Sequence, residues 1–390
     1  MPFRRRLALA FACGLVLALS GCFEDGGGSL VSPTSTSTFT ATSARYAALE
    51  TWAQGATPVL AGDTDLAASS WSMKSRWDSV VDLSKASGDL SAILADWNAR
   101  TPVASSWNAI DSLTDSLSVT RLVSFTVGGV SQGALVRSPL GASGKLPVIL
   151  FCHPSDDGMS MGYMHTLVQL MGTLASQVLI VAPAFRGETA SIGTDSVTSP
   201  TISQSPWDRD VDDALAALTA SLGTYPADPS HILALGYSRG GGVALLAALR
   251  DARIGSVFDI SGPADLFSPS FQALAIRLVN GGTSDLPGIP VLDTLLIKPF
   301  AAGTIYADSL RRGMLRRSAA RWALSGLLPT TLAIHGTADT TVNIDQSDAL
   351  VAATSQATLV PASGSTHLTV LISPALDTNL APFLKSRLGL

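Results

Sequence analysis

The sequence predicts an α/β fold in which a mostly parallel, twisted sheet has helices on both faces. Two observations lead to this class. Short apolar runs alternate with segments of helical spacing from residue 119 to the end of the chain, as in consecutive strand–helix–strand units. The run 231–237 also passes through a Gly-x-Ser-x-Gly pentapeptide at 236–240 into the helix-prone segment 243–249, which gives a strand, a sharp turn and a helix.

The first 21 residues have the pattern of an export signal. Three arginines at positions 4–6 precede an apolar stretch at 7–19, and Ser20 and Gly21 precede Cys22. The stretch is too short for an ordinary membrane span. Residues 19–22 match the bacterial lipobox, so we expect Cys22 to be lipidated and to anchor the exported chain to a bacterial membrane, on its periplasmic or cell-surface side. A plain secretory signal or a short anchor is the alternative.

Residues 22–44 form a predicted tether that is rich in Gly, Ser and Thr and cannot build a core. Only Cys152 would remain beside a lipidated Cys22, which leaves no disulfide framework. Removal of the three leader arginines would lower the formal charge from −5 to −8. An acidic surface argues against nucleic acid as a partner.

Residues 45–118 are predicted to form a helical N-terminal extension. Five of the seven tryptophans lie here, and helical spacings such as Leu90, Ile93, Leu94 and Trp97 recur. We expect this aromatic stripe to pack on the rest of the protein. A platform for substrate is the alternative.

The body, residues 119–390, should begin with a hairpin turned by Gly128-Gly129 and continue as alternating strands and helices. We expect the hairpin strands at 119–127 and 132–137; further strands at 147–152, 178–183, 231–237, 256–260, 331–334 and 358–360; and helices near 162–175, 208–222, 239–250, 345–355 and 374–387.

An insertion at about 265–322 interrupts this alternation and is predicted to form a helical cap. Its arginines are expected to make a solvated or salt-bridged face, with an anionic substrate or membrane phosphates as the alternative. We assign structural roles to Arg186 and to the aspartates at one helix start. The cap arginines are Arg311, Arg312, Arg316, Arg317 and Arg321, and the aspartates are Asp208, Asp210, Asp212 and Asp213.

Three residues form the candidate catalytic set. Ser238 occupies the pentapeptide, where a helix N-terminus favours developing negative charge. Asp339 and then His367 each follow a predicted strand. A serine hydroxyl needs a base to take its proton, and a carboxylate must hold the tautomer of that imidazole. Asp345 is the alternative acid, although its position favours a helix start.

These motifs resemble the α/β-hydrolase superfamily, and within it the catalytic domains of prolyl oligopeptidase and acylaminoacyl-peptidase type and related bacterial esterases. The resemblance covers about residues 119–390 and rests on the segments 184–188, 236–241 and 335–342 and on His367. The usual His-Gly-Gly loop is replaced by His-Pro-Ser-Asp-Asp-Gly at 153–158, and residues 1–118 are too few for the β-propeller of a prolyl oligopeptidase.

The oxyanion hole of such a fold takes one N–H group from the residue after the nucleophile and another from the loop after the third strand. Arg239 would supply the first. Pro154 has no N–H, so Ser155 is the expected second donor, although a solvated turn is the alternative for this loop.

The expected function is hydrolysis of a carboxylic ester through an acyl-enzyme. A peptidase or amidase is the runner-up, and a catalytically silent binding lipoprotein is the alternative of another class. The partner would be a small-molecule or peptide acyl substrate. Zinc, nucleotide and paired-cysteine motifs do not occur in the sequence, so no metal or other cofactor is expected.

Overall fold

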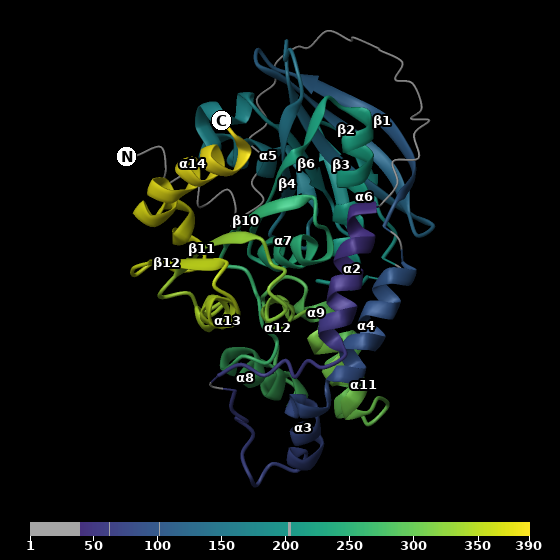
Figure 1. Cartoon of the computed structure of the whole chain (residues 1–390), viewed down its shortest axis with the longest axis vertical. Helices are drawn as coiled ribbons and strands as arrows, with labels where there is room; N and C mark the ends of the chain where they lie inside the picture. The colour runs from purple at the N-terminus through teal and green to yellow at the C-terminus, as the bar shows by residue number, and fades with distance from the viewer. Residues whose placement is uncertain (1–39, 62, 101, 202–203) are drawn as a thin grey trace.

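The computed structural model describes residues 40–390 except 62, 101 and 202–203, and a nine-stranded sheet is its centre (Figure 1). The strand order is β1-β2-β3-β6-β4-β9-β10-β11-β12. Pairing is antiparallel from β1 to β6 and parallel from β6 to β12. The strands are β1 Ala104–Thr114, β2 Ser118–Val127, β3 Val130–Pro139, β4 Leu146–Cys152, β6 Leu179–Pro183, β9 Ala227–Tyr237, β10 Ile254–Ile260, β11 Thr330–Gly336 and β12 Ala357–Ala362.

Helices cover both faces of the sheet because the central strands bury side chains in both directions. In β4, Val148, Leu150 and Cys152 contribute to one apolar core, and the alternate residues Ile149 and Phe151 contribute to the other. The first core includes α6 Arg209–Thr224, α7 Arg239–Arg250 and α13 Asp345–Ala353, and the second includes α5 Met161–Met171 and α14 Pro374–Leu388. The predicted strands and helices of the body are thus confirmed.

The N-terminal extension is helical only up to residue 99. It contains α2 Thr40–Ala53, α3 Lys74–Val81, a 3-10 turn Leu83–Lys85 and α4 Ser87–Ala99. The prediction of helix is wrong for β1, which pairs antiparallel with β2 as an edge strand. β1 is polar and its pairing shifts register twice, so its strand character depends on β2 rather than on its own periodicity.

The 265–322 segment is helical, as expected. Its helices are α8 Pro269–Val279, α9 Ile289–Leu292, a π turn Asp293–Ile297, α10 Lys298–Ala301, α11 Ala307–Leu315 and α12 Ala319–Ala323. α11 packs on α3 and α4, while α12 packs on α7 and α13. The tryptophans of the extension meet the cap in this region, where Trp97 lies 4.8 Å from Trp322 between ring centroids. The aromatic stripe is therefore a packing face.

A second, three-stranded sheet was not predicted. It consists of β5 Met159–Ser160, β7 Thr189–Ile192 and β8 Asp195–Thr198. This small sheet packs so tightly on β3 that a Cβ on Gly133 would lie 2.7 Å from Ala190 Cβ. Such short strands have too few residues to show a periodicity.

In the part of the chain that the structure describes, none of the helices is long and apolar enough to cross a membrane. The predicted leader, most of the tether and Cys22 lie outside the described residues.

Candidate active site

Ser238 lies at a strained turn between β9 and α7. Its φ is 54° and its ψ is −128°, a backbone conformation that few non-glycine residues adopt. The two glycines of the pentapeptide allow close approach, since a Cβ on Gly236 would overlap the Gly240 carbonyl and a Cβ on Gly240 would overlap the Cys152 carbonyl. The hydroxyl of Ser238 is therefore presented at the carboxyl end of the sheet, as a nucleophile elbow requires.

A continuous hydrogen-bond chain joins Ser238, His367 and Asp339. His367 Nε2 lies 2.8 Å from Ser238 Oγ, and His367 Nδ1 lies 2.7 Å from Asp339 Oδ2. A carboxylate accepts only, so Nδ1 carries the proton toward Asp339 and Nε2 is left to accept from the serine hydroxyl. Ser238 and Asp339 are buried, and His367 is half-buried. This arrangement can transfer a proton from serine to imidazole.

The carboxylate of Asp339 is fixed from both sides. Its Oδ1 accepts from the backbone N–H groups of Thr341 and Val342, each at 2.9 Å. Asp345, the alternative acid, instead accepts from the backbone N–H and the hydroxyl of Ser270 at the start of α8. The structure therefore brings Asp339 to His367 and holds Asp345 elsewhere.

His335 supports the loop that carries Asp339. Its Nδ1 lies 2.7 Å from Ser347 Oγ, and its Nε2 lies 2.8 Å from the Val342 carbonyl. Burial lowers the pKa of His335, so the neutral ring donates from Nε2 and accepts at Nδ1. Its role is to shape the acid loop.

Tyr237 is a site residue that sequence reasoning missed. Its hydroxyl donates to the His367 carbonyl at 2.7 Å, and its ring stacks on the His367 ring at 5.2 Å between centroids. Its place beside Ser238 in the pentapeptide is the one sequence feature that could have indicated it.

The two expected oxyanion donors lie on neighbouring segments. Arg239 begins α7, and the loop with Ser155 packs there, since a Cβ on Gly240 would meet the carbonyls of Cys152 and His153. Ser155 is half-buried, and its hydroxyl accepts from the Asp157 N–H. The roles of the Arg239 and Ser155 N–H groups stay predictions.

The Arg239 side chain is buried among carboxylates. It forms ion pairs with Asp210 at 2.8 Å, with Glu188 at 2.5 Å and with Asp156. Burial opposes its charge, but these carboxylates raise the pKa of Arg239 above its ordinary value. Burial raises the pKa of Asp210 to about 6, although the positive charge of Arg239 acts to lower it. The pKa of Glu188 is lowered, since Arg239 and His153 outweigh its burial.

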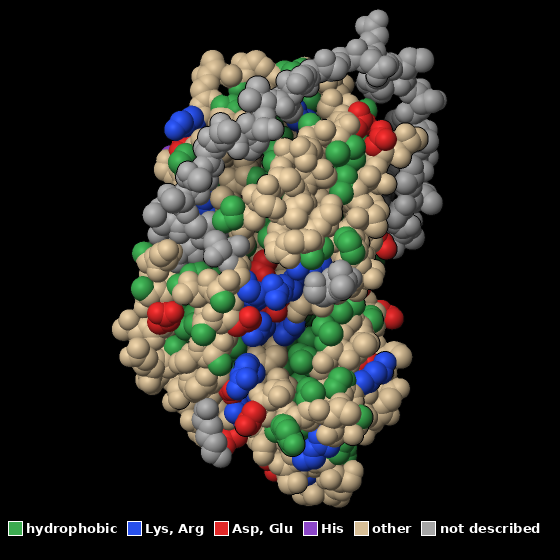
Figure 2. Space-filling view, turned by 90° about the vertical axis from the view of Figure 1, so that its right-hand side faces the viewer, with side chains coloured by type: hydrophobic (Ala, Val, Ile, Leu, Met, Phe, Trp, Pro, Cys, Tyr) green, Lys and Arg blue, Asp and Glu red, His purple; other side chains and the backbone are tan. Residues whose placement is uncertain are grey.

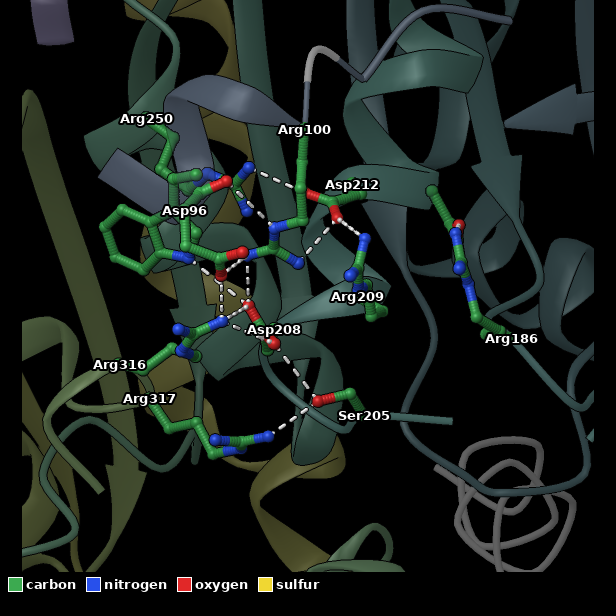
Figure 3. Close-up of polar contacts among 12 residues, drawn as sticks. Asp96, Arg100, Arg186, Ser205, Asp208, Arg209, Asp212, Arg250, Arg316 and Arg317 are labelled. Atoms are coloured by element: carbon green, nitrogen blue, oxygen red, sulfur yellow. Dashed lines mark hydrogen bonds and ion pairs between the residues drawn. The ribbon is translucent and has the colours of Figure 1, made fainter. Parts of the chain in front are cut away.

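The cap arginines form ion pairs and hydrogen bonds, mostly with the extension. Figure 2 shows Lys and Arg side chains gathered in the middle of one face, with acidic side chains beside them. In Figure 3, Arg100 and Arg316 converge on Asp208, while Arg317 reaches Ser205. Other ion pairs join Arg311 and Arg312 to Asp89, and Arg321 to Asp63 and Asp265. The salt-bridged face that the spacing favoured is therefore present.

The four aspartates near the start of α6 are also paired, more extensively than a helix-start role requires. Asp212 pairs with Arg100 and Arg250 (Figure 3). Asp213 pairs with Arg186 at 2.7 Å, although burial raises the pKa of Asp213 to about 7. Arg186 thus has the structural role that we expected.

Comparisons with known proteins support the fold. Neither the protein-family models nor the curated protein sequences contain a match to this chain. The acetyl xylan esterase from Paenibacillus sp. R4 has 16% identity, with 77% of this chain and 94% of that chain covered and a TM-score of 0.55. Acetyl xylan esterase 1 from Thermoanaerobacterium sp. JW/SL YS485 has 17% identity, with 70% and 88% covered and a TM-score of 0.50. At such identities the likeness concerns architecture, and together with the sheet order and the elbow it shows that this chain has the α/β-hydrolase fold.

Proposed function

We propose that this protein is a serine hydrolase that cleaves carboxylic esters through a covalent acyl-enzyme. The observation that carries the proposal is the hydrogen-bond chain from Ser238 through His367 to Asp339. Its distances suit proton transfer. Along the chain of hydrogen bonds, Ser238 is the nucleophile, His367 the base and Asp339 the acid that orients the imidazole.

The first half of the reaction forms the acyl-enzyme. Ser238 Oγ attacks the ester carbonyl while His367 Nε2 takes the hydroxyl proton, and Asp339 stabilises the imidazolium that results. The tetrahedral oxyanion is held by the N–H groups of Arg239 and Ser155. Collapse breaks the bond to the alcohol oxygen, and His367 returns the proton to the leaving alcohol.

The second half repeats these roles with water as the nucleophile. His367 takes a proton from water as it attacks the acyl carbonyl, and the new tetrahedral species collapses to expel Ser238 Oγ. The proton passes from His367 to the serine, and the carboxylic acid leaves. We propose an ester rather than an amide as the substrate because the two structural neighbours described above are both named as esterases.

A fluorophosphonate probe tests the proposal. The wild-type protein should be labelled on Ser238 and lose esterase activity, whereas Ser238→Ala should not be labelled and should lose activity by about 10³-fold or more. Parallel assays with chromogenic esters and aminoacyl-anilides decide between esterase and peptidase. A folded wild-type protein that neither takes the probe nor cleaves any substrate would instead support the silent binding lipoprotein.

We also propose that the mature chain is held at a bacterial membrane by an acylated Cys22. The pattern at residues 4–22 supports this, and the several acyl chains of a bacterial lipoprotein hold more stably than one chain. Full-length protein made in a bacterial host should begin at Cys22, incorporate labelled fatty acid and sediment with membranes, while Cys22→Ser should incorporate none. Mass spectrometry that finds an unmodified Cys22 contradicts the anchor without affecting the hydrolase proposal.

A further inference from the structure

A groove of about 660 Å³ lies between α8 and the loop that follows Asp339. Its lining includes Thr340, Thr341 and Asn343 of this loop, Arg277 of α8, and Asp285. Figure 1 shows α8 below α13, and Asp345 at the start of α13 joins the two helices through Ser270. The groove is therefore built on an anchored pair of elements.

Two contacts connect residues that line the groove to the candidate active site. Thr341 and Val342, which line it, donate the N–H groups that hold the Asp339 carboxylate. On another side the carbonyl of Pro263, also a lining residue, lies 2.6 Å from the Cβ position of Gly242 in the first turns of α7. A ligand in the groove would thus contact the segment that holds the acid and a residue that packs on the nucleophile helix.

Arg277 is the feature of this groove that stands out. Among the described residues it is the one arginine whose side chain has no hydrogen bond, ion pair or ring contact; the side chains of the others bind aspartates, glutamate, hydroxyls, carbonyls or aromatic rings. The first part of its side chain packs on Gly282, where a Cβ would lie 2.5 Å from Arg277 Cγ. Arg277 lines the groove and is exposed, so its side chain is accessible to solvent and to a ligand there.

We propose that this groove is a subsite for a carboxylate on the ester substrate and that Arg277 selects such anionic esters. A guanidinium presents paired N–H groups that match a carboxylate, and the bond is charge-assisted. The hydroxyls of Thr340 and Thr341 and the amide of Asn343 provide further polar contacts. The inference rests on the proposed esterase function and adds the class of substrate to it.

Asp285 gives the subsite a counter-charge. It lines the same groove and is exposed, so it repels an anion that Arg277 attracts. The preference for an anionic ester is the balance of these two charges. Substitutions at the two positions should therefore change the preference in opposite directions.

The test compares matched anionic and neutral esters in the full-length protein. One pair, mono-4-nitrophenyl glutarate and 4-nitrophenyl pentanoate, places the carboxylate on the acyl side. The other pair, 4-acetoxybenzoate and 4-acetoxybenzamide, places it on the leaving group. For each variant the measured quantity is the anionic-to-neutral ratio of kcat/KM, so that a general change in activity cancels.

Arg277→Gln should lower this ratio about fivefold in at least one pair, the scale of an ion pair at a solvent-accessible site. Asp285→Asn should raise the ratio, and added salt should reduce the wild-type preference. Arg387→Gln, which removes an arginine on α14 that contacts Phe383, is the charge-matched control and should leave the ratio unchanged. The pair that responds identifies the side of the ester that enters the groove.

Two outcomes overturn the inference and can be told apart. If the wild type cleaves esters but Arg277→Gln has the wild-type ratio in both pairs, the groove is not a carboxylate subsite and the esterase proposal stands. If the wild type cleaves none of the four esters, the proposed function fails and the subsite fails with it.

Discussion

The carboxylate of Asp156 forms an ion pair with the guanidinium of Arg239. Arg239 carries one predicted oxyanion donor, and Ser155, immediately before Asp156, carries the other. The second oxygen of Asp156 accepts from the Gly288 N–H of the cap at 3.1 Å. One side chain thus links the oxyanion loop, the nucleophile helix and the cap, which makes Asp156 a positioning residue for the proposed oxyanion hole.

Asp156→Asn should lower kcat about tenfold and change KM and the thermal midpoint little. Complete loss of an oxyanion donor costs about 10² to 10³ in rate, and a displaced donor should cost less. Asp157→Asn is the matched control on the same loop. Equal kinetics for these two variants, or a loss of stability without a loss of kcat, would show that the ion pair has no part in catalysis.

Tyr237→Phe should lower kcat/KM about fivefold, because one hydrogen bond to the His367 loop is lost while the stacked ring remains. Tyr237→Leu removes both contacts and should cost more. Steady-state assays measure whether Tyr237→Leu loses more kcat/KM than Tyr237→Phe. Tyr306→Phe, a change at an exposed tyrosine, is the control. Wild-type kinetics in Tyr237→Leu would exclude a positioning role.

Asp259 should make the protein less stable as pH rises from about 4 to 7. This carboxyl in β10 is buried against Gly241 and Gly262, and burial raises its pKa to about 7. Between the unfolded and folded pKa values the native state binds more protons than the unfolded state, so the free energy of unfolding falls with rising pH. Urea midpoints should depend less on pH in Asp259→Asn. Parallel midpoint curves for the two proteins would contradict this.

Asp89→Asn should destabilise the seam between the extension and the cap by about 3 kcal/mol, because it leaves the Arg311 and Arg312 guanidiniums without their shared buried carboxylate. Asp308→Asn removes an exposed partner of Arg311 and should change stability by less than about 1 kcal/mol. Chemical denaturation of both variants measures the difference. Similar losses of stability in the two variants would mean that the burial of Asp89 does not strengthen its ion pairs.

The elements that could be predicted from the sequence carry their own signal. β4, β6 and the second half of β9 are apolar runs of strand length. The order of Ser238, Asp339 and His367 along the chain reduces the candidates for the catalytic set to these three residues. β1 could not be predicted as a strand, because a polar edge strand is determined by its partner. Tyr237 and Asp156 could not be assigned roles, since their contacts join segments 130 and 83 residues apart. The groove that Arg277 lines could not be predicted either, because it is formed by α8 and the loop after Asp339, which are far apart in the sequence.

Trapping the acyl-enzyme tests the proposed role of Ser238 most directly. Rapid mixing of the full-length protein with a 4-nitrophenyl ester, acid quenching and peptide mass spectrometry should find the acyl mass on the peptide that contains Ser238 and on that side chain. A serine nucleophile gives this adduct in the wild type and none in Ser238→Ala. Ester turnover without an adduct on Ser238, or an adduct on another residue with turnover intact in Ser238→Ala, would contradict it.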